Sequence, residues 1–293
     1  MGAQDAIDQL AELHVHLEGT VTRETARDLA RRHGEPEPPA YEYSNLNGFF
    51  AVYFPVAGLM RTAEDFERVI LEHAAAMAAQ GIGYAEVSFN PSLHPGTDWL
   101  DGVQRGRTRA REVFGVEIAW LVELVRGGDA NEKTLEVALA TPGVTGLGLV
   151  GDEAIGASDL APLISRARRR GLRLMAHAGQ TGGPEVIREA VEVLSSDRIA
   201  HGVSAVDDPE VCELLASRDV CLCVCPSSNR RIGLRPDFKA LAVAHLALCV
   251  NTDDPAMVGT DLLRELDLAA DLGLDPEVLK ANAFKHRFLP SAR

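Results

Sequence analysis

The stretch LRLMAHAGQTGG, residues 172–183, joins a short apolar run to a histidine and a cluster of glycines. A segment with helical spacing, residues 183–194, comes directly after it. A brief apolar run that ends at turn residues is typical of a buried strand. This stretch therefore predicts a structural unit that consists of a strand, a polar turn and a helix.

The same unit recurs along the whole chain. Seven further apolar runs end in polar or glycine residues: AELHVHL (11–17), YAEVSFN (84–90), EIAWLVELV (117–125), GLGLVGD (146–152), RIAHGV (198–203), VCLCVCP (220–226) and LALCVNTDD (246–254). Segments with helical spacing lie between most of them, at residues 63–80, 101–114, 157–170 and 209–217. Strands that alternate with helices pair in parallel, and eight such units indicate a closed (β/α)₈ barrel of the TIM type.

We expect one barrel domain over residues 1–293, because no linker or low-complexity tract divides the chain. Residues 34–60 break the alternation between the first helix and the next. They are rich in proline and aromatic residues, whereas disordered linkers are poor in aromatic residues. We therefore predict an excursion of the chain over the mouth of the barrel.

Composition excludes several classes of protein. The formal net charge of −14 argues against a nucleic-acid partner, because attraction to phosphate needs basic patches. No apolar run approaches the ~20 residues of a membrane span, and the first residues do not resemble a secretory signal. The cysteines are odd in number, five, and three of them alternate at Cys221, Cys223 and Cys225. This usage favours reduced thiols in a cytoplasmic protein, and buried core positions for the three are favoured over a thiolate metal site.

Polar residues stand where the predicted strands end. In a TIM barrel the carboxyl ends of all strands meet at one rim, where barrel enzymes carry their active sites. Scattered residues therefore become one candidate site: His14, His16, Asp152, Glu153, His177, His201, Asp253 and Asp254.

Four of these residues predict a metal centre. His14 and His16 lie two residues apart, so on a strand they share one face. His177 adds a third nitrogen, and Asp253 adds a carboxylate. Three neutral histidines and one carboxylate form an open zinc site of the catalytic kind, in which the pKa of bound water falls to about 7. We expect one Zn²⁺ per chain, although Asp152 or Glu153 could bridge to a second metal ion.

The roles of two other rim residues remain open. His201 could be a fourth nitrogen ligand, a core histidine, or a group that orients the hydroxide and stabilises charge on the substrate. The last role is favoured, because four ligands are already present. Asp254 is either a solvated turn residue or a hydrogen-bonding partner of the substrate. Cysteine-ligated zinc deaminases, nucleophile-elbow hydrolases and dinucleotide-binding proteins fit the sequence less well.

The motifs AELHVHLEGT, GDE, HAGQ, RIAHGV, CPSSN and NTDDP together resemble the adenosine deaminase family of the amidohydrolase superfamily, over residues 11–288. This resemblance implies a zinc-dependent barrel that replaces the 6-amino group of a purine nucleoside by oxygen. It implies that His14, His16, His177 and Asp253 bind zinc and that His201 assists the attacking water. It also implies a set of substrate contacts: His16, Glu18 on the ribose side, the backbone of Gly151, and Asp254, which would hold the purine ring and align the nucleophile.

Gln180 departs from the family pattern, which reads HAGE. The family's glutamate donates a proton to the purine ring, whereas the amide of Gln180 donates a hydrogen bond but cannot transfer a proton. Loss of this acid should cost about 10²–10⁴-fold in rate while preserving binding. Gln180 could be an engineered replacement, a natural variant for a substrate with another leaving group or protonation route, a sign that catalysis is lost, or simply a cap of the next helix.

The sequence therefore predicts a zinc-dependent hydrolytic deaminase of adenosine or an adenosine-like nucleoside. In this prediction hydroxide attacks C6 and ammonia leaves, with Gln180 impairing or altering the activity. Two alternatives are a related amidohydrolase for another aminated heterocycle or leaving group, and a non-catalytic nucleoside-binding protein. The partner is a small molecule rather than nucleic acid or a membrane. The oligomeric state stays open, with a homodimer as one option.

Overall fold

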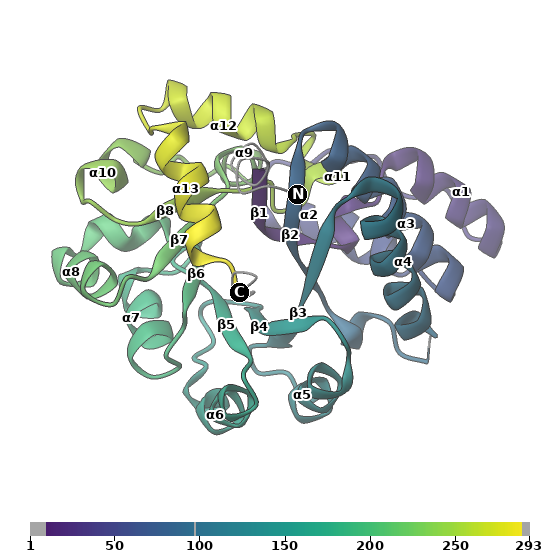
Figure 1. Cartoon of the computed structure of the whole chain (residues 1–293), viewed down its shortest axis with the longest axis horizontal. Coiled ribbons are helices and arrows are strands. Elements are labelled where there is room, and N and C mark those ends of the chain that lie inside the picture. The colour runs from purple at the N-terminus through teal and green to yellow at the C-terminus, as the bar shows by residue number, and fades with distance from the viewer. Residues whose placement is uncertain (1–9, 97, 289–293) are drawn as a thin grey trace.

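Eight parallel strands form one sheet whose order follows the sequence from β1 to β8, in a computed structural model that describes residues 10–96 and 98–288. The strands surround a central axis, and helices lie around the outside (Figure 1). Their bounds are β1 Leu10–His16, β2 Ile82–Phe89, β3 Glu117–Val125, β4 Val144–Val150, β5 Arg173–Ala178, β6 Arg198–His201, β7 Cys221–Val224 and β8 Leu248–Val250. The predicted (β/α)₈ barrel is confirmed.

The barrel closes between β1 and the residues that follow β8. The Asp253 amide donates to the His14 carbonyl at 3.1 Å, and the Asp253 carbonyl accepts from the His16 amide at 2.8 Å. The Asn251 side chain also accepts from the Leu13 amide at 2.7 Å. Closure therefore takes place at three of the four predicted metal ligands.

The helices end where local chemistry requires it. Helix α3 starts with a capping box between Thr62 and Asp65, and α1 ends at Gly34, whose φ of 68° suits glycine. The bounds are α1 Arg23–His33, α2 Leu46–Ala57, α3 Ala63–Ala79, α4 Trp99–Phe114, α5 Asn131–Ala140, α6 Ala161–Arg169, α7 Pro184–Glu192, α8 Pro209–Ser217, α9 Pro226–Arg231, α10 Phe238–Val243, α11 Pro255–Val258, α12 Leu262–Asp271 and α13 Pro276–His286. Short 3₁₀ helices occupy Glu18–Thr20, Pro91–Leu93, Ser158–Leu160 and Val203–Asp207.

Two hydrophobic cores stabilise the barrel. The larger core packs the outer faces of the strands against the helices and includes Val15 and Trp120. The smaller core fills the barrel interior and includes Leu13, Cys223 and Phe288. Phe288 follows α13, which lies against β8 and β1. Packing on both faces explains why the strand sequences are continuously apolar.

The excursion at residues 34–60 contains a helix that the sequence pattern did not reveal. Helix α2 begins after Asn45, whose side chain accepts from the Gly48 amide at 2.8 Å. Its sequence LNGFFAVYFPVA is apolar nearly all around, so the apolar stripe of an amphipathic helix is missing. Rings of this helix and Tyr43 line the central cavity.

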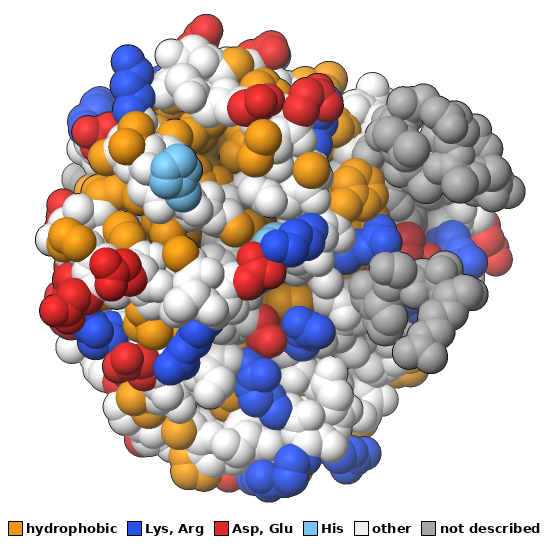
Figure 2. Space-filling view, turned by 60° about the vertical axis from the view of Figure 1, so that its left-hand side comes forward, with side chains coloured by type: hydrophobic (Ala, Val, Ile, Leu, Met, Phe, Trp, Pro, Cys, Tyr) orange, Lys and Arg blue, Asp and Glu red, His pale blue; other side chains and the backbone are white. Residues whose placement is uncertain are grey.

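Charges on the surface are mixed. On the face shown in Figure 2, lysine and arginine side chains alternate with aspartate and glutamate side chains. Among the described residues, no helix is long and apolar enough to cross a membrane. The residues at the start of the chain, on which the prediction about a secretory signal rested, lie outside the described part.

Candidate metal centre and substrate cavity

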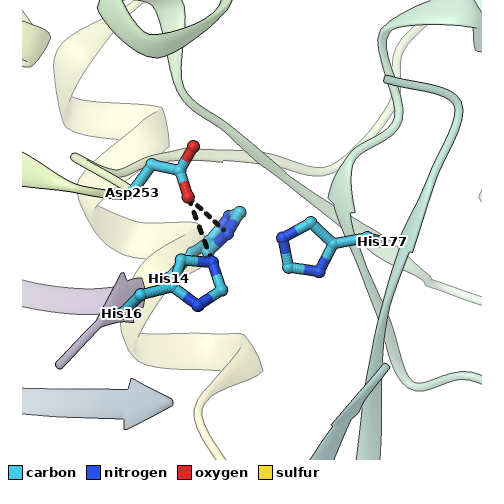
Figure 3. A group of neighbouring side chains, drawn as sticks. All are labelled: His14, His16, His177 and Asp253. Atoms are coloured by element: carbon cyan, nitrogen blue, oxygen red, sulfur yellow. Dashed lines mark ion pairs between the residues drawn. The ribbon is translucent and has the colours of Figure 1, made fainter. Parts of the chain in front are cut away.

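His14, His16, His177 and Asp253 converge at the carboxyl ends of their strands (Figure 3). One potential ligand atom from each lies within 4.8 Å of the others. The Nε2 atoms of His14 and His16 are each 3.2 Å from Oδ1 of Asp253, and the ring of His177 points toward them from the opposite side. The structure thus brings together the four residues predicted to bind a metal ion.

An irregularity in β1 helps to direct both histidines of the HVH motif inward. Glu12 pairs with Ala85 and Val15 pairs with Val87, so β1 contains one residue more than β2 over this interval. Leu13 belongs to the inner core and Val15 to the outer core. Such an extra residue is a β-bulge, which re-aims side chains locally. It allows His14 to join His16 at the metal centre although Leu13 also points inward.

Asp253 takes an unusual backbone conformation to reach the centre. Its φ of 66° lies in the left-handed region, as does the φ of 62° at His201. Residues other than glycine adopt this region rarely, and such strain is concentrated at functional sites. The bridge to β1 holds Asp253 in this conformation.

Hydrogen bonds from surrounding residues fix the orientation of the ligands. Nδ1 of His16 lies 2.6 Å from Oε1 of Glu123, and Nδ1 of His177 lies 3.0 Å from the Leu149 carbonyl. The Ser228 hydroxyl donates to Oδ2 of Asp253 at 2.6 Å. When Nδ1 donates to an oxygen, Nε2 keeps its lone pair, which suits a metal ligand.

The chemistry of this donor set fits zinc. Burial lowers the pKa of His177 to well below its usual value, and the neighbouring histidines lower it further, so its ring is neutral at pH 7. Nε2 of His14 is buried and makes no hydrogen bond among the described residues, although Oδ1 of Asp253 lies 3.2 Å from it. A buried imidazole nitrogen that makes no hydrogen bond and lies beside a carboxylate and other imidazoles suits a metal ligand.

A second group of potential ligands is less suitable. His201, Cys225 and Asp253 also lie within reach of one another. Burial, and then the charge of Asp253, raise the pKa of the Cys225 thiol well above its usual value. Because only the thiolate binds metal strongly, this group competes poorly with the four predicted ligands. All three cysteines of the CLCVC segment are buried and free, as predicted.

Asp152 and Glu153, which could have bridged to a second metal ion, make hydrogen bonds to backbone amides instead. Oδ1 of Asp152 accepts from the Ala154 amide at 2.9 Å in a turn. Glu153 is buried and accepts from the amides of Gly179, Gln180 and Gly182, at 2.8 to 3.3 Å. Neither belongs to a cluster of potential ligands within the described ranges. Glu153 instead holds the loop that carries Gln180.

His201 lies beside the metal centre and lines the cavity. Its Nε2 is 3.7 Å from Oδ2 of Asp253, and its ring lies 5.0 Å from that of His14 between centroids. Burial lowers the pKa of His201 to about 3. The structure therefore places a neutral imidazole where it can contact a bound water or substrate.

Asp254 also borders the cavity and is 4% exposed. Burial, and then the charge of Asp253, raise its pKa well above the usual range. Its Oδ1 has no hydrogen-bond partner among the described residues. Gly19 makes room for it, because a Cβ at Gly19 would lie only 1.9 Å from Oδ1.

Gly151 and Gln180 line the same cavity. Gly151 has a φ of 110°, a conformation that glycine permits. The side-chain nitrogen Nε2 of Gln180 donates to Oδ1 of Asn229 at 3.3 Å. Gln180 therefore lies in the site. It belongs to the loop between β5 and α7.

Glu18 does not reach the cavity, in contrast to the expectation of a contact on the ribose side. It lies in the short 3₁₀ helix after β1 and its side chain is 0% exposed. Its carboxylate accepts from the Asn90 amide at 3.2 Å and pairs with His94 at 3.1 Å, while the Tyr53 hydroxyl donates to it at 3.3 Å. Glu18 supports the cavity wall from behind through Tyr53.

The cavity has a volume of about 600 Å³ and reaches from the metal centre to α2. Five aromatic residues from the 34–60 excursion form one wall: Tyr43, Phe49, Phe50, Tyr53 and Phe54. The lining within the described ranges includes carboxylates but no lysine or arginine. This composition favours a ligand that is partly apolar and carries no negative charge.

Three residues of the site were missed by sequence reasoning: Glu123, Ser228 and Asn229. The last two lie in the CPSSN motif, where a polar cluster after an apolar strand was a usable signal. Glu123 lies within the apolar run WLVELV, and an acid in a buried strand is itself a signal. Its partner, however, is 107 positions away in the chain.

Comparisons with known proteins agree with this geometry. The family model described as adenosine deaminase matches residues 9–293. The chain is 34% identical to the aminodeoxyfutalosine deaminase of Acidothermus cellulolyticus, over 92% of this chain and 84% of that protein. It is 31% identical to the crystal structure of adenine deaminase from Arthrobacter aurescens, with a TM-score of 0.89, over 97% of this chain and 94% of that one.

A more distant structure, an amidohydrolase from Burkholderia ambifaria with bound zinc, shares 23% identity over 99% of this chain and 89% of that one. Its TM-score of 0.84 supports the fold. The match to the family model covers almost the entire chain, and the motifs of the metal centre fall inside it. This chain belongs to the adenosine deaminase family.

Proposed function

We propose that this protein is a zinc-dependent hydrolytic deaminase of an uncharged 6-aminopurine, adenosine or a related nucleoside. The observation that carries the proposal is the convergence of His14, His16, His177 and Asp253 at the end of a cavity. We further propose that the chain binds one zinc ion, because Asp152 and Glu153 are engaged elsewhere. Zinc in such a site acts as a Lewis acid and lowers the pKa of a water molecule to about 7.

Residues around the centre would orient the reactants. His201, neutral and beside Asp253, would accept a hydrogen bond from the attacking water and keep it aimed at C6 of the purine. Asp254 would hydrogen-bond to the purine ring with its unpaired carboxyl oxygen. The Gly151 backbone, at the far end of β4, would contact the base.

Gln180 limits the rate in this mechanism. Its amide can donate a hydrogen bond to a ring nitrogen, but a carboxylic acid is needed to transfer a proton. The ring nitrogen must then take its proton from water, and the reaction should be slower by about 10²–10⁴-fold than with an acid at this position. Binding should suffer little, because glutamine and glutamate have nearly the same size.

The residues that line the cavity limit the chemical class of the substrate. A phosphate group would be buried without a cationic partner, which is costly, so a nucleotide is disfavoured. The volume of about 600 Å³ is in the range of pockets for whole drug-sized ligands. It therefore suits a purine with a substituent better than a bare base. The aromatic wall on α2 would contact that substituent or the sugar.

Ammonia release from the zinc-loaded protein tests the proposal. Adenine, adenosine and AMP are offered at equal concentration, and both the wild-type protein and Gln180→Glu are assayed. We expect slow release from adenosine, little from AMP, and faster release from Gln180→Glu. Absence of release from all three with the stoichiometrically zinc-loaded Gln180→Glu variant would refute the substrate class.

Gln180 also supports a second candidate, a nucleoside-binding protein without catalysis. In that case adenosine binds with micromolar or better affinity, yet Gln180→Glu releases no ammonia. Calorimetric titration beside the ammonia assay separates the two functions.

The cellular setting is a further proposal. All five cysteines are free, which suits a reducing compartment such as the cytoplasm. We also propose that residues 1–293 form one domain, since the described strands belong to one sheet.

A further inference from the structure

Glu123 is a buried carboxylate that the proposed chemistry does not use. It lies in β3, is 3% exposed, and borders the cavity next to the metal centre. Its Oε1 is 2.6 Å from Nδ1 of His16. Among the described residues His16 is the one ion-pair partner of Glu123, and no lysine or arginine side chain pairs with it.

Burial of such a carboxylate is costly unless something compensates for the lost hydration. If the role of Glu123 were purely structural, an arginine partner would compensate its burial better than a histidine. Glu86 in the same barrel has such a partner, the buried Arg198. Glu123 is paired instead with a residue whose other nitrogen faces Asp253 at 3.2 Å. The partner of Glu123 is thus a predicted metal ligand, and the hydrogen bond acts on that ligand.

The neighbouring strand leaves space for this arrangement. Gly148 of β4 is paired with Glu123 across the sheet. A Cβ at Gly148 would lie 3.1 Å from Cγ of Glu123, closer than ordinary van der Waals contact. A glycine at this point of β4 therefore leaves room for the Glu123 side chain, whose carboxylate contacts His16.

We propose that Glu123 is a positioning residue for the metal centre: its carboxylate accepts the Nδ1 hydrogen of His16, holds the ring with Nε2 toward the cation, and strengthens cation binding. The carboxylate also makes the imidazole a better electron donor, as carboxylates behind metal-bound histidines do. This inference rests on the proposed metal ligands and adds a residue that acts through one of them.

Metal affinity and the spectrum of a cobalt-substituted protein test the inference without relying on activity. Zinc affinity is measured by competition with a chelator, and the visible absorption of the Co²⁺ form reports ligand geometry. We expect Glu123→Ala to bind zinc about 10–100-fold more weakly, which is the usual effect of removing such a partner. We also expect its cobalt spectrum to change, because the His16 ring is free to rotate.

Glu123→Gln covers the case in which the alanine variant does not fold. Its amide oxygen still accepts the Nδ1 hydrogen, so the cobalt spectrum should resemble that of the wild type. The negative charge is lost, so zinc affinity should fall by a smaller factor than in Glu123→Ala. Wild-type zinc affinity in Glu123→Gln would overturn the role of the carboxylate.

Asp65→Ala is a matched control. Asp65 is a buried carboxylate that pairs with a histidine, His33, at 2.8 Å, but it lies at the start of α3 and does not line the cavity. Its removal should lower the melting temperature and leave zinc affinity and the cobalt spectrum unchanged.

The outcomes are distinguishable. If the wild-type protein does not bind zinc stoichiometrically, the proposed function fails at its first step. If the wild type binds zinc and Glu123→Ala binds it equally well with the same cobalt spectrum, only the role of Glu123 is wrong.

Discussion

Gly19→Ala should displace Asp254 and thereby impair catalysis without removing the metal. A Cβ at position 19 would lie 1.9 Å from Oδ1 of Asp254 and 2.6 Å from its Cβ and Cγ. An ordinary contact needs roughly 3.5 Å, so the carboxylate must move by about 1.5 Å. The Asp254 backbone cannot follow easily, because its carbonyl accepts from the amides of Met257 and Val258 at 3.0 and 2.8 Å.

Misplacement of a substrate-orienting group by about 1 Å can cost 10²-fold in rate, which corresponds to about 2.7 kcal/mol of transition-state stabilisation. We therefore expect kcat/KM of Gly19→Ala to fall by about two orders of magnitude. Ammonia release measures this loss, and the Gln180→Glu background raises the signal if the wild-type rate is low. Zinc content should remain one ion per chain, because the three atoms nearest to the added Cβ all belong to Asp254 and not to the four ligands.

Gly58→Ala is the matched control. A Cβ there would meet its nearest neighbour, the Phe54 carbonyl oxygen, at an ordinary 3.5 Å, and the φ of −63° suits alanine. It should leave kcat/KM within a factor of about three of the wild type. A Gly19→Ala protein with wild-type kcat/KM would show that Asp254 does not orient the substrate.

Three further changes have expected outcomes. Gln180→Glu should raise the rate of ammonia release by about 10²–10⁴-fold, and an unchanged rate would mean that no proton is needed at this position. His177→Ala should lose stoichiometric zinc in elemental analysis, and full occupancy would contradict the ligand set. The third change concerns His73, whose pKa burial lowers to about 4. Because the pKa of His73 is lower in the folded state, the unfolded chain binds more protons than the folded chain between pH 6.5 and about 4. The contribution of His73 to the free energy of unfolding is therefore fully present above pH 6.5 and is lost as the pH falls to about 4. The loss is about 3 kcal/mol, and denaturant titrations at several pH values should show a smaller acid loss in His73→Leu than in the wild type.

Much of the fold could be predicted from the sequence because strand and helix periods are local. The observed bounds of β3 and α8 coincide with the predicted ones. Predicted helix 157–170 begins later, at Ala161, because Ser158–Leu160 forms a 3₁₀ turn. Helix α2 was not predicted because its residues are apolar nearly all around, so it lacks the pattern of an amphipathic helix.

The candidate site also contains residues that could be predicted from the sequence and residues that could not. The grouping of His14, His16, His177 and Asp253 could be predicted because they lie near or just after the carboxyl ends of their strands, and barrel topology brings these ends together. Glu18 was expected on the ribose side, whereas its carboxylate contacts His94 from the 3₁₀ helix that follows Leu17. Glu123 was missed because its function depends on where β3 and β1 lie relative to each other in space.

The central claim is that four residues, distant in sequence, bind one zinc ion. Anomalous diffraction at the zinc edge from crystals of the zinc-loaded protein tests it most directly. The account predicts one peak per chain within about 2.0–2.2 Å of His14, His16, His177 and Asp253. A peak bound by His201 and Cys225 instead, or no peak between these four residues, would contradict it.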